Sequence, residues 1–69
     1  MMETVLLKVE GMSCSHCERA VKNAVGALDG VKSVAVSLKD KTVTVEHDPM
    51  KAPLAKIRQE IEDQGYEVK

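Results

Sequence analysis

The spacing of hydrophobic residues along this 69-residue chain switches between two periods, and the order of the switches limits the folds open to it. A period of two indicates a half-buried strand, and a period of three to four indicates a helix with one apolar stripe. Strand spacing occurs at residues 4–9, 33–38, 42–46 and 66–68, and helical spacing occurs at 15–29 and 53–63. The sequence therefore predicts the order strand, helix, strand, strand, helix, strand.

The first predicted helix has sequence signals at both of its ends. Ser15 and Glu18 fit the capping-box pattern, in which a serine at the N-cap and a glutamate three residues later satisfy free N–H groups. Gly30 suits the left-handed position that follows a helix, which makes Asp29 the last helical residue. The apolar stripe between these ends consists of Val21, Ala24, Val25 and Leu28. We therefore predict a helix from Ser15 to Asp29 that buries one face.

The second half of the chain predicts a hairpin and then another helix. The polar turn 39–41 joins two segments in which valine or leucine alternates with smaller or polar residues, and this is typical of a β-hairpin. Pro53 fits the first turn of a helix, where its missing N–H group needs no partner. Gly65 is expected to end this helix. The residues that the helix is expected to bury are Leu54, Ile57 and Ile61.

These elements combine into one expected fold. Each strand–helix–strand half should cross over right-handed, which places both helices on one face of the sheet. The result is an α+β ferredoxin-like βαββαβ sandwich with a four-stranded antiparallel sheet, formed by residues 1–69 as a single domain. A domain of this size buries little core, so its stability must come from compact local packing.

The composition argues against several classes of protein. The chain has 10 basic and 11 acidic residues and a net charge of −1, which gives no electrostatic case for binding nucleic acid. Tyr66 is the one aromatic residue, so there is no platform for stacking bases. Uninterrupted apolar runs are too short for a membrane-inserted helix or a signal-peptide core. We therefore expect a cytoplasmic protein whose thiols stay reduced.

The two cysteines of the chain stand three residues apart, with a histidine between them. Cys14, His16 and Cys17 lie where the first predicted strand gives way to the first predicted helix. Both sulfurs can then point to one spot near the helix N-terminus, where unpaired N–H groups and the helix dipole favour a thiolate. The dipole contributes about 0.3–1 kcal/mol, which helps thiolate formation but does not by itself decide the chemistry.

The number of candidate ligands separates the metals that such a site could bind. Zinc takes three or four protein ligands, whereas this chain offers two good ones, with His16 as a weaker third. Soft thiolates favour copper(I), which accepts two ligands. A two-thiolate loop is also open to an incoming thiolate, which suits a carrier. A thiol–disulfide redox site and two incidental buried thiols remain as alternatives, and Met12 is either a thioether ligand or a core anchor.

The motif around the cysteines resembles that of a known family. Residues 11–17 have the pattern Gly-Met-x-Cys-x-x-Cys after a strand, and residues 61–66 (IEDQGY) match the same family near its end. Over nearly its whole length the chain resembles the heavy-metal-associated domain family, and within it bacterial copper chaperones. The resemblance implies a cytosolic carrier, not an enzyme, that binds copper(I) through Cys14 and Cys17. Such carriers pass copper to the metal-binding domains of a copper-transporting P-type ATPase, and some also load a copper-responsive repressor.

The same resemblance suggests roles for His16 and Tyr66, and it leaves the role of His16 and the class of protein with alternatives. His16 is either an auxiliary ligand in a copper-bridged homodimer or a solvent-facing residue that tunes the site. Tyr66 is expected close to the metal loop, where it and Met12 would surround the ligands. Zinc-transporting relatives often have an aspartate where this chain has Ser13. An excised N-terminal metal-binding domain of a heavy-metal P-type ATPase would have the same sequence features, and His47 receives no role.

Overall fold

The computed structural model describes all 69 residues and contains four strands and two helices. The elements, in chain order, are β1 (Glu3–Glu10), α1 (Ser15–Gly26), β2 (Val31–Ser37), β3 (Thr42–His47), α2 (Leu54–Asp63) and β4 (Glu67–Val68). This is the predicted order of strands and helices. None of the helices is long and apolar enough to cross a membrane.

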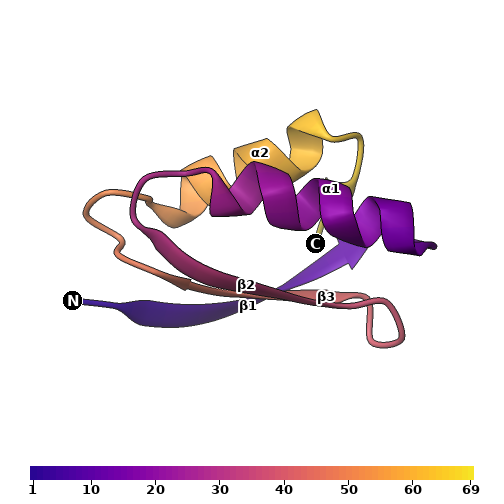
Figure 1. Ribbon diagram of the computed structural model, residues 1–69, viewed down its shortest axis with the longest axis horizontal. Helices are drawn as coiled ribbons and strands as arrows, with labels where there is room; N and C mark the ends of the chain where they lie inside the picture. The colour runs from indigo at the N-terminus through magenta and orange to yellow at the C-terminus, as the bar shows by residue number, and fades with distance from the viewer.

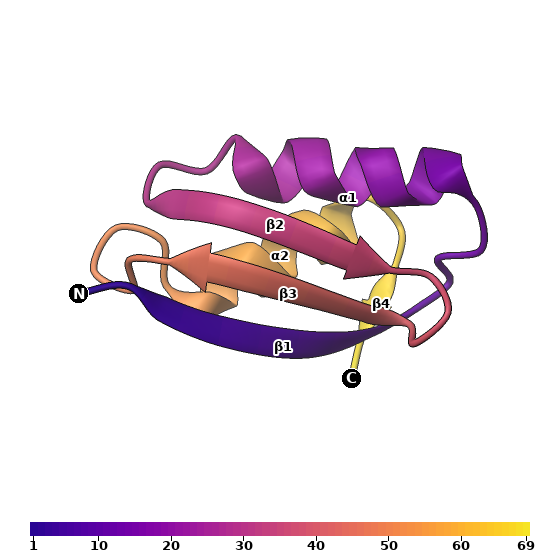
Figure 2. The ribbon, with the colours of Figure 1, turned by 60° about the horizontal axis from the view of Figure 1, so that its bottom comes forward.

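The strands form one antiparallel sheet in the order β2-β3-β1-β4. Val43 in β3 lies opposite Leu7 of β1 on one side and Val36 of β2 on the other, while Val9 lies opposite Val68 of β4. Both helices lie on the same face of this sheet (Figure 1), and the opposite face carries no helix (Figure 2). The ferredoxin-like α+β architecture is therefore confirmed.

The core lies between the sheet and the helices. Its apolar members come from alternate strand positions, from the inner faces of both helices and from the loop before α1, and they are Leu7, Val9, Met12, Val21, Val25, Val43, Val45, Ile57, Ile61 and Val68. Each fully buried valine or isoleucine side chain stabilises the fold by about 1.5–3 kcal/mol relative to an exposed one. Residues from the strands with period-two spacing and from the helices thus form a single buried cluster.

Helix α1 begins at Ser15 as predicted, but its N-cap and its last residue differ from the prediction. Cys14, and not Ser15, is the N-cap: its backbone is extended, the N–H of Glu18 donates to its carbonyl (3.2 Å), and no side chain caps the helix. The capping box is therefore absent, because the first turn closes one residue earlier than the pattern requires. The helix ends at Gly26, not Asp29, since the chain must turn sharply to enter β2.

A short turn replaces the last predicted helical residues. The N–H of Leu28 donates to Val25, and the N–H of Val31 donates to Leu28, at 3.1 and 3.2 Å. Gly30 has the predicted left-handed backbone, with φ of +100°, but it belongs to this turn and not to a helix cap. A Cβ atom at Gly30 would lie 2.6 Å from the Cβ of Lys51, so a side chain has no room there.

Two details of helix α2 also differ from the prediction. Pro53 is the N-cap, one residue before the helix, with φ of −65° and an extended ψ. Leu54 is 40% exposed and not buried, whereas Ile57 and Ile61 are buried as predicted. Helical side chains lean over the preceding turn, and the first residue of a helix has no preceding turn to cover.

His47, which sequence reasoning left without a role, is buried at the end of β3. The residue is 4% exposed, and its Nδ1 lies 2.8 Å from the carbonyl oxygen of Ala52. A carbonyl oxygen can only accept, so Nδ1 carries the proton and donates. This bond ties the end of β3 to the segment that leads into α2. The alternation Val43, Val45, His47 was the sequence signal that this side chain faces the core.

We predict that His47→Leu lowers the free energy of unfolding by about 1–3 kcal/mol, because the buried carbonyl of Ala52 loses its donor. The measurement is urea denaturation followed by circular dichroism on the metal-free protein. His16→Leu is the matched control, since His16 is exposed and should leave the midpoint unchanged. Equal midpoints for the two variants would contradict a structural role for His47.

Candidate metal site

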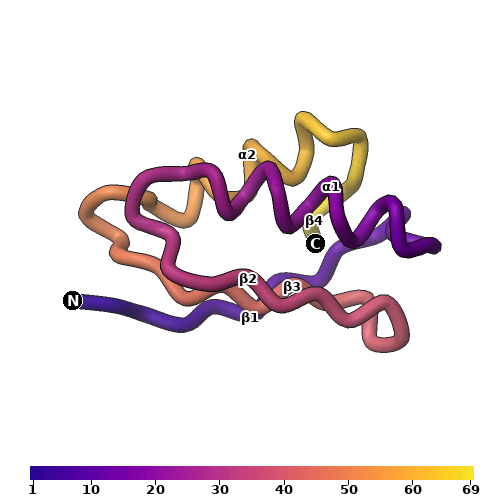
Figure 3. Tube along the Cα trace, in the orientation of Figure 1, coloured from indigo at the N-terminus to yellow at the C-terminus, as the bar shows by residue number.

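The loop between β1 and α1 is held in place from both sides. Gly11 has φ of +99°, a conformation that residues with a side chain rarely adopt, and a Cβ there would lie 3.3 Å from Cδ1 of Tyr66. Met12 is 4% exposed and belongs to the core cluster. Figure 3 shows this loop and the segment between α2 and β4 at the same end of the molecule. The loop therefore enters α1 in a set direction.

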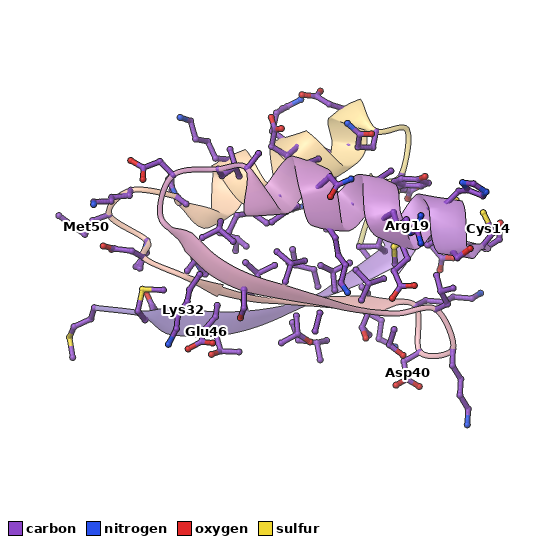
Figure 4. All side chains as sticks on the ribbon, viewed as in Figure 1. Cys14, Arg19, Lys32, Asp40, Glu46 and Met50 are labelled. Carbon is purple, nitrogen blue, oxygen red and sulfur yellow. The ribbon has the colours of Figure 1, made fainter.

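The two cysteines come together at the first turn of α1. Cys14 is the N-cap and Cys17 is the third helical residue, and their Sγ atoms lie 3.5 Å apart. Both are free thiols, and one can donate to the other. Cys14 is exposed at the tip of the molecule (Figure 4), whereas Cys17 is half-buried against the core. The site is thus a dithiol with one solvent-facing member.

The surroundings of Cys17 favour its thiolate. Hydrogen bonding lowers the pKa of Cys17 from its ordinary value of 9.0 to about 7. The largest cause is the side chain of Tyr66, followed by the backbone of Ser13 and the thiol of Cys14. The same interaction raises the pKa of Tyr66, because the hydroxyl is held by Cys17. Near neutral pH a large share of Cys17 is therefore ionised and ready to bind a cation.

The other predicted site residues, His16, Met12 and Tyr66, lie in different environments. His16 is exposed, and no group of three or more histidine, cysteine or acidic side chains is gathered closely enough to hold a metal ion. The burial of Met12 in the core favours the interpretation of this residue as a loop anchor. Tyr66 is half-buried, packs against the core and lies beside the loop at Gly11, as the prediction placed it. Sequence reasoning missed the effect of Tyr66 on the pKa of Cys17, because the two residues are far apart in the sequence.

The chemistry of this arrangement follows from its ligand types and number. Two sulfur ligands suit soft ions, and a two-ligand site falls short of the three or four protein ligands of zinc sites. The exposure of Cys14 leaves one side of the site open to a further ligand. A bound soft ion could therefore be reached by an incoming thiolate without unfolding of the loop.

A four-stranded antiparallel sheet with two helices on one face and a dithiol at the start of α1 defines a small metal-binding domain. The family model for the heavy-metal-associated domain matches residues 6–67, and the chain belongs to this family.

Known proteins similar to this chain fall into the same group. A relative from Staphylococcus aureus, described as "Copper chaperone CopZ", is 45% identical over 67 residues, which cover 97% of this chain and 98% of the relative. The solution structure of a putative copper-ion-binding protein from Bacillus anthracis is 46% identical, with a TM-score of 0.96 over 100% of this chain and 97% of that one. The Cu(I)-loaded N-terminal domain of a potential copper-translocating P-type ATPase from Bacillus subtilis is 29% identical, with a TM-score of 0.95, and covers 100% of this chain and 86% of that one.

We predict that Tyr66→Phe raises the pKa of Cys17 from about 7 towards 9, because the variant lacks the hydroxyl that stabilises the thiolate. Each unit of increase lowers the thiolate fraction at neutral pH by up to about tenfold. The measurement is the pH dependence of iodoacetamide alkylation in the metal-free, reduced protein, with the modified cysteine identified by mass spectrometry. An unchanged midpoint in Tyr66→Phe, with His16→Ala as the control, would show that Tyr66 does not tune this thiol.

Proposed function

We propose that this protein is a cytoplasmic copper(I) carrier that binds the ion through Cys14 and Cys17. The observation that carries the proposal is the pair of free thiols 3.5 Å apart, with Cys14 exposed and no third ligand gathered around them. Two thiolates satisfy a soft ion that accepts two-coordinate binding, and the open side permits its release. The relatives described as copper chaperones, and the copper-binding neighbours in structure, support copper as the cargo.

Delivery to a partner follows from ligand exchange. A thiolate of the partner enters at the exposed side as a third ligand, Cys14 or Cys17 then leaves, and the second exchange completes the transfer. At every stage at least two sulfurs hold the ion, so it is never released to water. Because donor and acceptor use similar ligands, the transfer is nearly isoenergetic, and its direction follows concentrations and onward consumption.

We propose as partner the metal-binding domains of a copper-transporting P-type ATPase. The similarity in structure to such a domain from Bacillus subtilis supports this partner, because the two would present matching thiol loops. The contact would be brief and would involve the loop and two exposed residues of α1, Arg19 and Lys22. Figure 4 shows Arg19 close to Cys14. Loading of a copper-responsive repressor, and a copper-bridged homodimer in which His16 adds a ligand, are further parts of this proposal.

Two alternatives share some of these features. An excised ATPase domain would have the same fold, but the identity of 45% to a copper chaperone against 29% to an ATPase domain favours the free carrier. A thiol–disulfide enzyme would also have a cysteine of lowered pKa. Anaerobic copper(I) titration against a strong chelator, together with the reduction potential of the dithiol, separates the carrier from the enzyme.

We predict that Cys14→Ser and Cys17→Ser each abolish chelator-resistant copper(I) binding, because one thiolate cannot hold the ion alone. The circular dichroism spectrum should stay unchanged, since neither residue lies among the buried core residues. His16→Ala is the matched control: it should keep the affinity of the monomer and change only metal-linked dimerisation, measured by analytical ultracentrifugation. Retained tight binding in either cysteine variant would remove the two-thiolate site from consideration.

We predict that copper-loaded protein transfers its ion to an acceptor domain with its own Cys-x-x-Cys motif in the presence of excess chelator. Direct exchange keeps the ion bound to sulfur throughout, so the chelator should not intercept it. The measurement is copper content of donor and acceptor after rapid separation. Complete capture by the chelator would make this protein a copper buffer instead of a carrier.

A further inference from the structure

The separation of the two thiols does not match the straight geometry of a two-coordinate ion. With bonds as long as zinc–sulfur bonds, about 2.3 Å, a linear arrangement needs the two Sγ atoms about 4.6 Å apart. The Sγ atoms of Cys14 and Cys17 are 3.5 Å apart. Two bonds of about 2.3 Å that span this gap meet at an angle of about 100°. The dithiol is thus placed for a bent central atom, and a linear ion requires the exposed Cys14 side chain to move outward.

We propose that the Cys14–Cys17 dithiol also binds monosubstituted trivalent arsenicals as a bidentate chelate. Trivalent arsenic forms three bonds and keeps a lone pair, so its bonds are arranged as a pyramid and its S–As–S angle is bent. It is thiophilic, and a single chelating pair of thiols occupies two of its three bonds. The 3.5 Å separation of the Sγ atoms therefore suits this centre without rearrangement of the loop.

The number of thiols specifies which arsenicals should bind. The chain has two cysteines, so the third bond of arsenic must go to a group that the protein does not provide. In a monosubstituted arsenical this group is a carbon atom, which is not exchanged in water. In inorganic arsenite it is a hydroxyl, which leaves the complex open to hydrolysis or to a further thiol. We therefore expect arylarsenicals to bind more tightly than arsenite.

The surroundings of the dithiol leave room for the carbon substituent. Cys14 is exposed at the tip of the molecule (Figure 4). The neighbouring Ser13, Ser15 and His16 are exposed as well. Cys17 is half-buried against the core, so the chelate is held from below while the substituent extends towards solvent. Arsenical binding should therefore depend on the two free thiols more than on the shape of the carbon substituent.

The reaction is a condensation in which no atom changes its oxidation state. A hydrated arylarsenoxide, aryl–As(OH)₂, reacts with the two S–H groups to form aryl–AsS₂. Two As–O bonds and two S–H bonds break, two As–S bonds form, and two water molecules leave with the thiol protons. Arsenic remains trivalent, so no oxidant or reductant is needed. Since the same sulfurs would hold copper(I), the two ligands exclude each other.

Phenylarsine oxide is the probe for testing this proposal with the reduced, metal-free protein under anaerobic conditions. Intact-mass spectrometry should show one phenylarsenic group per chain that resists excess monothiol and is removed by a dithiol. Chelation raises the effective concentration of the second thiol, so Cys14→Ser and Cys17→Ser should each weaken binding by about a hundredfold or more. Cys14→Ala and Cys17→Ala should behave like the serine variants, and Met50→Ala, at an exposed residue far from the dithiol, should match the unmodified protein.

Several results would overturn the proposal. These are a wild-type adduct that monothiol removes as easily as the adduct of Cys14→Ser, a cysteine variant that retains full binding, or arsenite that binds as tightly as phenylarsine oxide. A copper(I) titration of the same preparation is run in parallel. Copper binding without a stable arsenical adduct defeats this inference alone, whereas a stable adduct without copper binding defeats the proposed carrier function alone.

Discussion

The packing of helix α1 on the sheet is the interaction on which the rest of the structure depends. Val21 and Val25, on the inner face of α1, are fully buried and join Val9, Val43 and Val45 in one apolar cluster. This burial fixes the axis of the helix, and with it the position of its first turn. The first turn carries both cysteines, so the geometry of the dithiol is set by hydrophobic contacts deeper in the domain. The metal ligands themselves contribute little to holding the fold together.

The same packing explains how the site can be both ordered and open. Met12 anchors the loop in the core, and Cys17 packs against the core, while Cys14 projects into solvent. One thiol therefore has a fixed environment that stabilises its charge, and the other can move towards a partner. A carrier needs both properties, because the ion must be bound firmly and still be reachable by another ligand. A site closed on all sides would bind the ion firmly but would not let another ligand reach it.

Functional and structural tasks are separated along the length of the molecule. The thiol loop and Tyr66 lie at one end, next to the start of α1. At the other end, His47 donates to Ala52, and Gly30 packs closely against Lys51. These contacts hold the connections between strands and helices far from the cysteines. Changes at the metal end can therefore affect ligand chemistry with little effect on the core.

The sequence by itself determined the order of the elements, the face that each buries and the identity of the thiol pair. These features are local: period-two and helical spacing reflect burial of neighbouring side chains, and two cysteines three residues apart on a helix start must lie close together. The assignment of Tyr66 to the loop region came from family resemblance and agrees with its contact at Gly11. The first residue of helix α1 was predicted correctly, whereas its N-cap and its last residue were placed wrongly from local signals.

Only the tertiary structure decided the features that depend on residues far apart in the chain. Ser15 and Glu18 could have formed a capping box, but the path of the loop into the helix makes Cys14 the N-cap. Helix α1 stops at Gly26 because β2 must begin beside β3, and no local pattern contains that requirement. The lowered pKa of Cys17 depends on the hydroxyl of Tyr66, the residue just before β4. The local sequence thus determines which strands and helices form and which cysteines are the candidate ligands. Packing between distant segments determines where helix α1 ends and lowers the pKa of Cys17.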